Sequence, residues 1–251
     1  MVIDAHAHLG GSAISGLEVS SDQLLGAMDE AGIDAAIVQP FPHPSRPAPE
    51  LHDAIAELAQ KHRGRIYGLA SISPHFPEEE YAREAERCIG GLGFVGIKLH
   101  PLGHLAPIRA VSSDIVFATC ARLGVPIMIH TGFGVPFTLP SLAIPRARQY
   151  PDLTIVLAHA GESLYSGEAV VAAEECPNVY LETSWSKPGE IRGFITKLGS
   201  DRVMMGTDLP DNARTEMAKY RSIAVDDADR KRSLCETARD VFGLKDVVAL
   251  R

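Results

Sequence analysis

The chain has 251 residues, a hydrophobic fraction of 45% and a formal net charge of −8. This length is normal for a single α/β barrel, and the apolar fraction is enough for a substantial core. No apolar run approaches the ~18 residues that a membrane span needs, and lysine and arginine form no basic stripe of the kind that binds nucleic acid. We therefore expect neither a membrane nor a nucleic acid as a partner.

The N-terminus and the cysteines indicate the compartment. No basic segment precedes an apolar one at the N-terminus, so no export signal is expected. The cysteines, Cys88, Cys120, Cys176 and Cys235, are scattered and lack both close pairing and the spacing of a zinc site. This usage is typical of reduced, buried thiols, so the sequence predicts a cytoplasmic protein.

Eight short apolar runs alternate with longer amphipathic segments. Their continuous apolar character is typical of buried parallel strands, and they cover residues 2–5, 35–39, 66–71, 95–99, 126–129, 154–158, 179–181 and 203–205. Capping residues predict a first helix that begins at Ser21 and ends at Gly32. Helical spacing predicts further helices at residues 50–62, 78–89, 113–123, 162–176, 188–198 and 227–242. Eight such units predict an α/β fold, a single (β/α)8 TIM barrel that occupies residues 1–251 as one domain.

The first strand ends in two histidines. Side chains alternate between the faces of a strand, so His6 and His8 should point the same way. Two neutral imidazoles that face one point make half of a metal site. The other half must come from residues far along the chain.

Three later apolar runs also end in a polar residue. His130 follows residues 127–129, His159 follows residues 156–158, and Asp208 follows residues 204–207. A single histidine after a strand is more often structural, but the carboxyl ends of all strands in a closed barrel converge on one rim. Burial of such a set without partners would be costly, whereas a divalent cation needs only three or four ligands. Taken together, the set predicts a metal site.

These motifs resemble those of the amidohydrolase superfamily, in the branch with amidohydrolase-related decarboxylases and small lactonases. The matching segments are Asp4-Ala5-His6-Ala7-His8, Gly96-Ile97-Lys98-Leu99-His100-Pro101, Ile129-His130-Thr131-Gly132, Ala158-His159-Ala160-Gly161, Glu182-Thr183-Ser184 and Gly206-Thr207-Asp208-Leu209-Pro210. Residues 236–244 resemble the closing helix of the family, with Thr237 where an asparagine is usual.

The resemblance implies a role for each of these polar residues. His6, His8 and Asp208 would hold zinc or a similar divalent ion, with His130 as a further ligand. Asp208 would also accept the proton of metal-bound water. His159 would polarise the substrate or shuttle a proton in a one-metal site, and would bind the second ion in a two-metal site. Asp208 and His159 are therefore the expected catalytic residues.

Lys98 separates the one-ion and two-ion cases. Two-metal relatives carry a carboxylated lysine at the end of the fourth strand, where it bridges the ions. An unmodified ammonium cannot ligate a metal, and would instead bind an anionic substrate. We favour one ion, because this branch often uses one. His100 shares the strand with Lys98, but Pro101 indicates that the strand stops there, so His100 is left out of the ligand set.

The expected function is hydrolysis of a small substrate, a lactone, ester or amide, by metal-activated water. The first alternative is metal-dependent decarboxylation of an aromatic or unsaturated acid. Branch members with that activity tend to carry long insertions, and this chain is near the minimal barrel length, which favours hydrolysis. The second alternative is a metal-binding barrel without activity. The partner is a small-molecule substrate in either enzyme, and a homodimer is left open.

Some residues carry weaker expectations. Two loops, residues 40–49 and 131–140, would form walls of a substrate pocket. Trp185, the only tryptophan, is as consistent with pocket lining as with packing. Arg46 would pair with a substrate carboxylate, although exposure in a loop is the simpler account. The simplest account of Glu162 is the start of the next helix. The remaining histidines, His43, His52, His62, His75 and His104, are expected on the surface.

Overall fold

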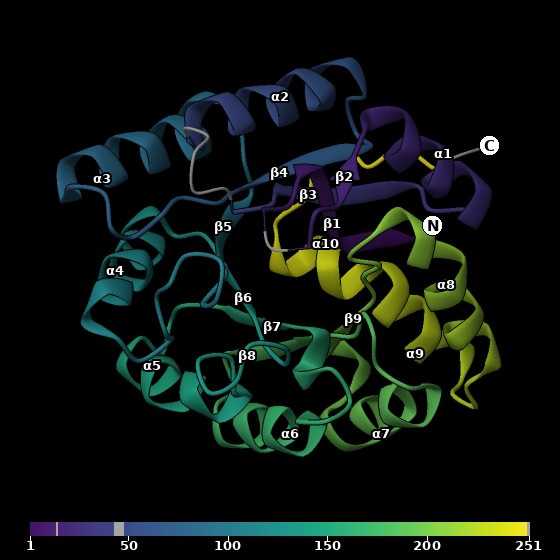
Figure 1. Cartoon of the computed structure of the whole chain (residues 1–251). Helices are drawn as coiled ribbons and strands as arrows, with labels where there is room; N and C mark the ends of the chain where they lie inside the picture. The colour runs from purple at the N-terminus through teal and green to yellow at the C-terminus, as the bar shows by residue number, and fades with distance from the viewer. Residues whose placement is uncertain (14, 43–47, 250–251) are drawn as a thin grey trace.

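The computed structural model describes residues 1–13, 15–42 and 48–249 (Figure 1). In this part of the chain the parallel strands pair in sequence order around one curled sheet. They are β1 (Ile3–Gly11), β3 (Ala35–Pro40), β4 (Ile66–Ala70), β5 (Gly96–Leu99), β6 (Ile127–His130), β7 (Ile155–Ala158), β8 (Val179–Glu182) and β9 (Val203–Met204). A short strand that the sequence did not predict, β2 (Glu18–Val19), pairs antiparallel with the end of β1.

Helices surround the strands as an outer ring (Figure 1). They are α1 (Ser21–Ala31), α2 (Ala48–Lys61), α3 (Glu78–Glu86), α4 (Asp114–Leu123), α5 (Ile144–Gln149), α6 (Ser166–Glu175), α7 (Pro188–Leu198), α8 (Ala213–Ser222) and α9 (Asp227–Lys231). A further helix, α10 (Thr237–Val241), lies inside this ring (Figure 1). The sequence did not predict α5 or α8, and α6 starts later than expected. Within the described ranges, no helix is both long and apolar enough to cross a bilayer.

The first and last parallel strands meet at a short seam. The Ala5 N–H donates to the carbonyl of Met205 (2.9 Å), and the Asp208 N–H donates to the carbonyl of His6 (2.7 Å). One isolated parallel bridge joins Ala7 to Asp208. The fold is therefore α/β and similar to a TIM barrel. The continuous eighth ladder expected of a closed barrel is absent from the described residues, because β9 has two residues before the chain turns toward Asp208.

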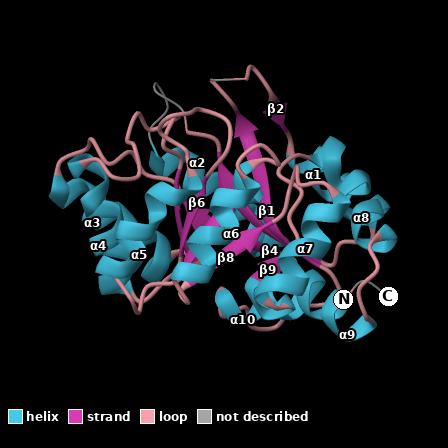
Figure 2. Cartoon of the chain, turned by 90° about the horizontal axis from the view of Figure 1, so that it is seen from below, coloured by secondary structure: helices cyan, strands magenta, loops and turns pink. Residues whose placement is uncertain are grey.

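Apolar side chains form two cores, one on each face of the sheet. Ile37, Met128 and Met204 belong to the inner core, which also includes Phe242 after α10. Helix α10 covers the end of the sheet opposite the end toward which β1 points (Figure 2). The outer core fills the space between the strands and the ring of helices. Because α10 covers one end of the barrel, the open end is the one that contains the carboxyl ends of the strands. Active sites of other barrels lie at this end.

A bulge in β1 directs its two histidines inward. The pairing of β1 with β3 shifts register between Asp4 and Ala7. Ile3 belongs to the inner core, whereas Ala7 belongs to the outer core, although both are odd-numbered residues of one strand. A one-residue bulge exchanges the two faces of a strand. His6 and His8 consequently face the inside of the barrel.

Candidate metal centre

Three of the predicted ligands present their donor atoms to a common point. The Nε2 atoms of His6 and His8 are 3.3 Å apart. The Oδ1 atom of Asp208 lies 3.5 Å from Nε2 of His6 and 3.3 Å from Nε2 of His8. Two ligands bound to one ion at about 2.1 Å, with a bond angle of roughly 90–110°, are about 3.0–3.4 Å apart. The spacing of these three atoms therefore fits a single divalent ion.

Both imidazoles are held in the neutral form that a metal requires. Burial, together with the nearby Lys98 charge, holds the pKa of His6 well below its usual range. Burial likewise lowers the pKa of His8. Nδ1 of His6 donates to Oε2 of Glu182 (2.8 Å), which leaves the lone pair of Nε2 to face the centre. Nδ1 of His8 is buried and has no hydrogen-bond partner among the described residues.

Asp208 would contribute negative charge to the candidate centre. Burial alone would raise the pKa of Asp208, but interactions with His159, His8 and His6 outweigh burial and hold that pKa well below its usual range. The carboxylate is therefore ionised. Its second oxygen, Oδ2, accepts a hydrogen bond from the indole N–H of Trp185 (2.9 Å).

The two later histidines lie beside this centre. Nδ1 of His159 is 2.7 Å from Oγ of Ser184, and its Nε2 is 3.0 Å from Nδ1 of His130. Possible donor atoms of His6, His159 and Asp208 all lie within 4.8 Å of one another. Nε2 of His130 faces the carbonyl of Phe133 at 2.8 Å. His159 is thus adjacent to the three-ligand group, whereas His130 lies one imidazole further away.

Lys98 lies beneath the centre. Its side chain is 1% exposed, and Nζ is 3.1 Å from Nε2 of His6. Burial lowers the pKa of Lys98 to about 8, although Asp208 and Glu182 act in the opposite direction. The described residues that line the adjacent cavity do not include Lys98. Lys98 therefore lies closer to the predicted metal ligands than to the space that a substrate would occupy.

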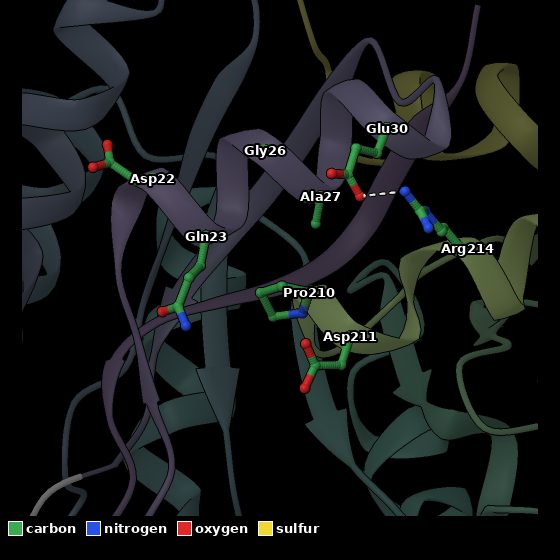
Figure 3. Close-up of a pocket in the computed structure, with 8 residues that line it drawn as sticks. All are labelled: Asp22, Gln23, Gly26, Ala27, Glu30, Pro210, Asp211 and Arg214. Carbon is green, nitrogen blue, oxygen red and sulfur yellow. Dashed lines mark hydrogen bonds and ion pairs between the residues drawn. The ribbon is translucent and has the colours of Figure 1, made fainter.

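A cavity of about 240 Å³ opens above the centre. Polar lining comes from His8, His159 and Asp208, and apolar walls include Phe41 and Trp185. Trp185 thus lines the pocket. Pockets for drug-sized ligands measure roughly 300–1,000 Å³, so this cavity suits a molecule with a single ring. A larger cleft of about 450 Å³ lies between α1 and residues 210–214, and none of the predicted site residues lines it (Figure 3).

The backbone at this rim adopts unusual conformations. His159, Trp185 and Asp208 have φ values of 66°, 67° and 66°. Side chains other than glycine rarely adopt this left-handed region, and such residues tend to cluster at functional sites. Glu162 also has a positive φ (49°), lines the cavity and precedes the first residue of α6, Ser166. The expectation that Glu162 begins a helix was therefore wrong.

Sequence reasoning gave Glu182 no role, although it belongs to a matching motif. The carboxylate is fully buried and accepts hydrogen bonds from Nδ1 of His6 (2.8 Å), the N–H of His159 (3.1 Å) and Oγ of Ser184 (2.9 Å). A carboxylate that holds the far nitrogen of a metal-binding histidine orients the ring and raises its basicity. The available signal was a charged residue that directly follows the apolar run 179–181, as His130 and His159 follow theirs.

Two histidines expected on the surface are buried. Nδ1 of His52 donates to Oε1 of Glu84 (2.6 Å), and Nε2 of His52 accepts the N–H of Ser71 (2.9 Å). His104, 6% exposed, lies 3.2 Å from Oγ of Ser71. Both histidines gain partners that compensate for burial, which a single sequence does not reveal. The expectations for His43 and Arg46 fall outside the described residues.

The chain belongs to a known family. The profile of a family described as Amidohydrolase matches residues 3–244, so the chain belongs to that family. A gamma-resorcylate decarboxylase from Polaromonas sp. is 25% identical over 285 aligned positions, which cover 89% of this chain and 87% of the relative.

Solved structures agree on the fold. A 2,6-dihydroxybenzoate decarboxylase in complex with 2,6-dihydroxybenzoate superposes with a TM-score of 0.78 at 20% identity, over 97% of this chain and 98% of the other. A dihydroxybenzoic acid decarboxylase from Polaromonas sp., with bound manganese and the inhibitor 2-nitroresorcinol, gives a TM-score of 0.75 at 20% identity, over 96% of each chain.

These relatives overturn the expectation of a hydrolase. Two sequence relatives, both gamma-resorcylate decarboxylases, and the two solved structures described above are decarboxylases, which was the first alternative. The expectation of a hydrolase rested on chain length. Chain length does not determine which groups line the substrate cavity, and therefore does not determine the reaction. Zinc was also expected, whereas a similar structure contains manganese.

Proposed function

We propose that this protein is a divalent-metal-dependent decarboxylase that releases carbon dioxide from a small hydroxylated aromatic acid. The observation that carries this proposal is the convergence of His6, His8 and Asp208 at the base of a single-ring-sized cavity. The substrate class comes from the relatives, whose names specify a resorcylate or a dihydroxybenzoate. We also propose that residues 1–251 act as one barrel domain, closed at the seam between β1 and Asp208.

His6, His8 and Asp208 would hold the ion, with His159 completing the set. His130, which was expected as a further ligand, lies one imidazole away from this group. Manganese is the first candidate, because it is present in a similar decarboxylase. A bound divalent ion supplies positive charge that stabilises negative charge on substrate oxygens. Lys98, which lies beside His6 and outside the cavity lining, would adjust the charge of the ligand set or, if carboxylated, join it.

Asp208 is the group that would move the proton. It lines the cavity, and its carboxylate is ionised. In that form it would take the proton of a substrate hydroxyl ortho to the carboxylate and give it to the ring carbon that bears the carboxylate. The electrons of the breaking carbon–carbon bond return to the ring, carbon dioxide leaves, and the product oxygen takes one proton from solvent. His159, buried beside Asp208, would help to keep Asp208 ionised before the substrate binds.

The direct test is carbon dioxide release from 2,6-dihydroxybenzoate by manganese-loaded protein. We expect turnover that a chelator removes and that added manganese restores. Asp208→Asn should lower kcat by about two to four orders of magnitude, the range for a positioned proton-transfer group. Asp211→Asn, three residues along the same loop and outside this cavity, is the matched control and should retain activity.

Three results would contradict the proposal. One is a metal-loaded protein that releases no carbon dioxide from a panel of ortho-hydroxylated aromatic acids. That result would favour the remaining alternative, a metal-binding barrel without activity. Another is full activity after chelation. The third is an equal loss of kcat in the Asp208 and Asp211 variants.

A further inference from the structure

We infer that Trp185 is a positioning residue of the metal centre, because its indole N–H fixes the orientation of the Asp208 carboxylate. This inference rests on the metal site of the proposed function. It assigns to the only tryptophan of the chain a role beyond that of a pocket wall.

The two oxygens of Asp208 have different partners. Oδ2 accepts the Nε1–H of Trp185 at 2.9 Å, while Oδ1 faces Nε2 of His8 at 3.3 Å and Nε2 of His6 at 3.5 Å. A hydrogen bond to an ionised carboxylate is about twice as strong as a neutral one. Rotation of the carboxylate would break this bond, so the indole holds Oδ1 toward the proposed ion and commits Asp208 to a single ligand atom.

Trp185 is itself held by the backbone. Its φ of 67° is unusual for a bulky residue, and such a conformation persists only where the surroundings determine it. The N–H of Trp185 donates to Oε1 of Glu216 (2.8 Å), and the N–H of the preceding Ser184 donates to Oε1 of Glu182. Both carboxylates are fully buried, so their positions are fixed by packing and they hold the turn at Trp185 in place.

Glu216, on α8, links the turn of Trp185 to the turn of Asp208. The side-chain amide of Asn212 donates to Oε1 of Glu216 (2.9 Å) and to the carbonyl of Thr207 (3.0 Å). One carboxylate oxygen therefore connects the residue that donates the indole bond with the segment that presents Asp208. The relative positions of indole and carboxylate are fixed through the backbone as well as through the side chains.

The competing account is that Trp185 serves only as apolar wall. Its side chain is 43% exposed and lines the cavity, which fits that account equally well. The two accounts differ over the indole N–H. A wall needs the ring alone, whereas positioning needs the hydrogen-bond donor, so Trp185→Phe separates the two.

The first experiment measures manganese affinity by calorimetric titration, which does not depend on turnover. We expect Trp185→Phe to weaken binding about 10- to 100-fold, the range for the loss of a partner that orients a metal ligand. In turnover assays kcat should fall while KM for the aromatic acid changes little. Tyr67→Phe also removes one aromatic donor, whose acceptor is the carbonyl of Lys245 away from the cavity, and should leave manganese affinity unchanged.

The second experiment reads the hydrogen bond in the wild-type ring. With one tryptophan in the chain, the ¹⁵N–¹H spectrum contains a single indole resonance. We expect Asp208→Ala to shift this resonance and to accelerate its exchange with solvent. This readout keeps the inference testable even if Trp185→Phe does not fold.

The outcomes separate this inference from the proposed function. Unchanged manganese affinity in Trp185→Phe, or an indole resonance unmoved by Asp208→Ala, would overturn the positioning role. Failure of the wild type to bind manganese would overturn both proposals. Weakened binding in Trp185→Phe, together with no turnover of any aromatic acid by the wild type, would support the positioning role and refute the decarboxylase.

Discussion

At the scale of single residues, the two ring nitrogens of His6 have different partners and different roles. Nδ1 donates to the fully buried Glu182, and Nε2 points toward His8 and Asp208. The carboxylate therefore selects the tautomer whose lone pair faces the proposed ion. Burial raises the pKa of Glu182, and hydrogen bonds from His159 and Ser184 oppose that rise.

Glu182→Gln tests this arrangement. The amide has nearly the same shape but lacks the charge, so it would orient and polarise His6 less well. We expect manganese affinity to fall about 10- to 100-fold in a calorimetric titration, with the fold retained. Glu86→Gln, which removes the same charge from an exposed pair with Arg122, is the control and should bind manganese as the wild type does. Equal affinities in all three proteins would show that Glu182 does not support the centre.

At the scale of elements, the bulge in β1 decides which face the histidines occupy. Alternation predicted that His6 and His8 share a face, and they do. It could not predict that this face is the inner one, because Ile3 and Ala5 on the same strand also point inward. A register shift depends on pairing with β3 and on the seam with residues 205–208, neither of which is encoded locally.

The close approach of β1, β8 and Gly206 gives a second prediction. A Cβ on Gly206 would lie 2.4 Å from Oε1 of Glu182 and 2.9 Å from Cβ of His6, and both side chains are fully buried. Gly206→Ala should therefore reduce the free energy of unfolding by about 1–3 kcal/mol and weaken manganese binding. Denaturant titration and calorimetry measure the two effects.

The matched control is Gly26→Ala in α1. A Cβ at Gly26, which borders the cleft shown in Figure 3, meets no atom within 4 Å. Alanine favours a helix by about 0.5–1 kcal/mol over glycine, so this variant should be as stable as the wild type or more stable. If the Gly206→Ala protein is as stable as the Gly26→Ala protein, the prediction is wrong. Glu182 and His6 could then move to accept a methyl group at residue 206 without a loss of stability.

At the scale of the whole molecule, the sequence predicted all eight parallel strands, because each is a continuous apolar run between helical segments. It also predicted that His6, His8, His159 and Asp208 meet at one end, since parallel strands place their carboxyl ends together. It missed α8, whose Glu216 lies on a mainly polar helix, and it missed the buried partners of His52 and His104. Those features depend on contacts between distant segments rather than on periodicity.

The reaction was harder to predict than the site. Two imidazoles and a carboxylate around one ion can serve hydrolysis or decarboxylation, because the ion stabilises negative charge in both. What separates the two reactions is the cavity above the ion and the group that carries the proton. The loop at residues 40–49 was expected to form a wall of the pocket, and Phe41 does line it. The Trp185–Asp208 hydrogen bond cannot be inferred from motif spacing.

The most direct test of this account is the anomalous scattering of manganese in crystals of the metal-loaded protein. We predict a peak within bonding distance of Nε2 of His6, Nε2 of His8 and Oδ1 of Asp208, and its loss in crystals of Asp208→Ala. A peak elsewhere, or no peak in crystals of protein that decarboxylates an aromatic acid, would contradict the proposed centre.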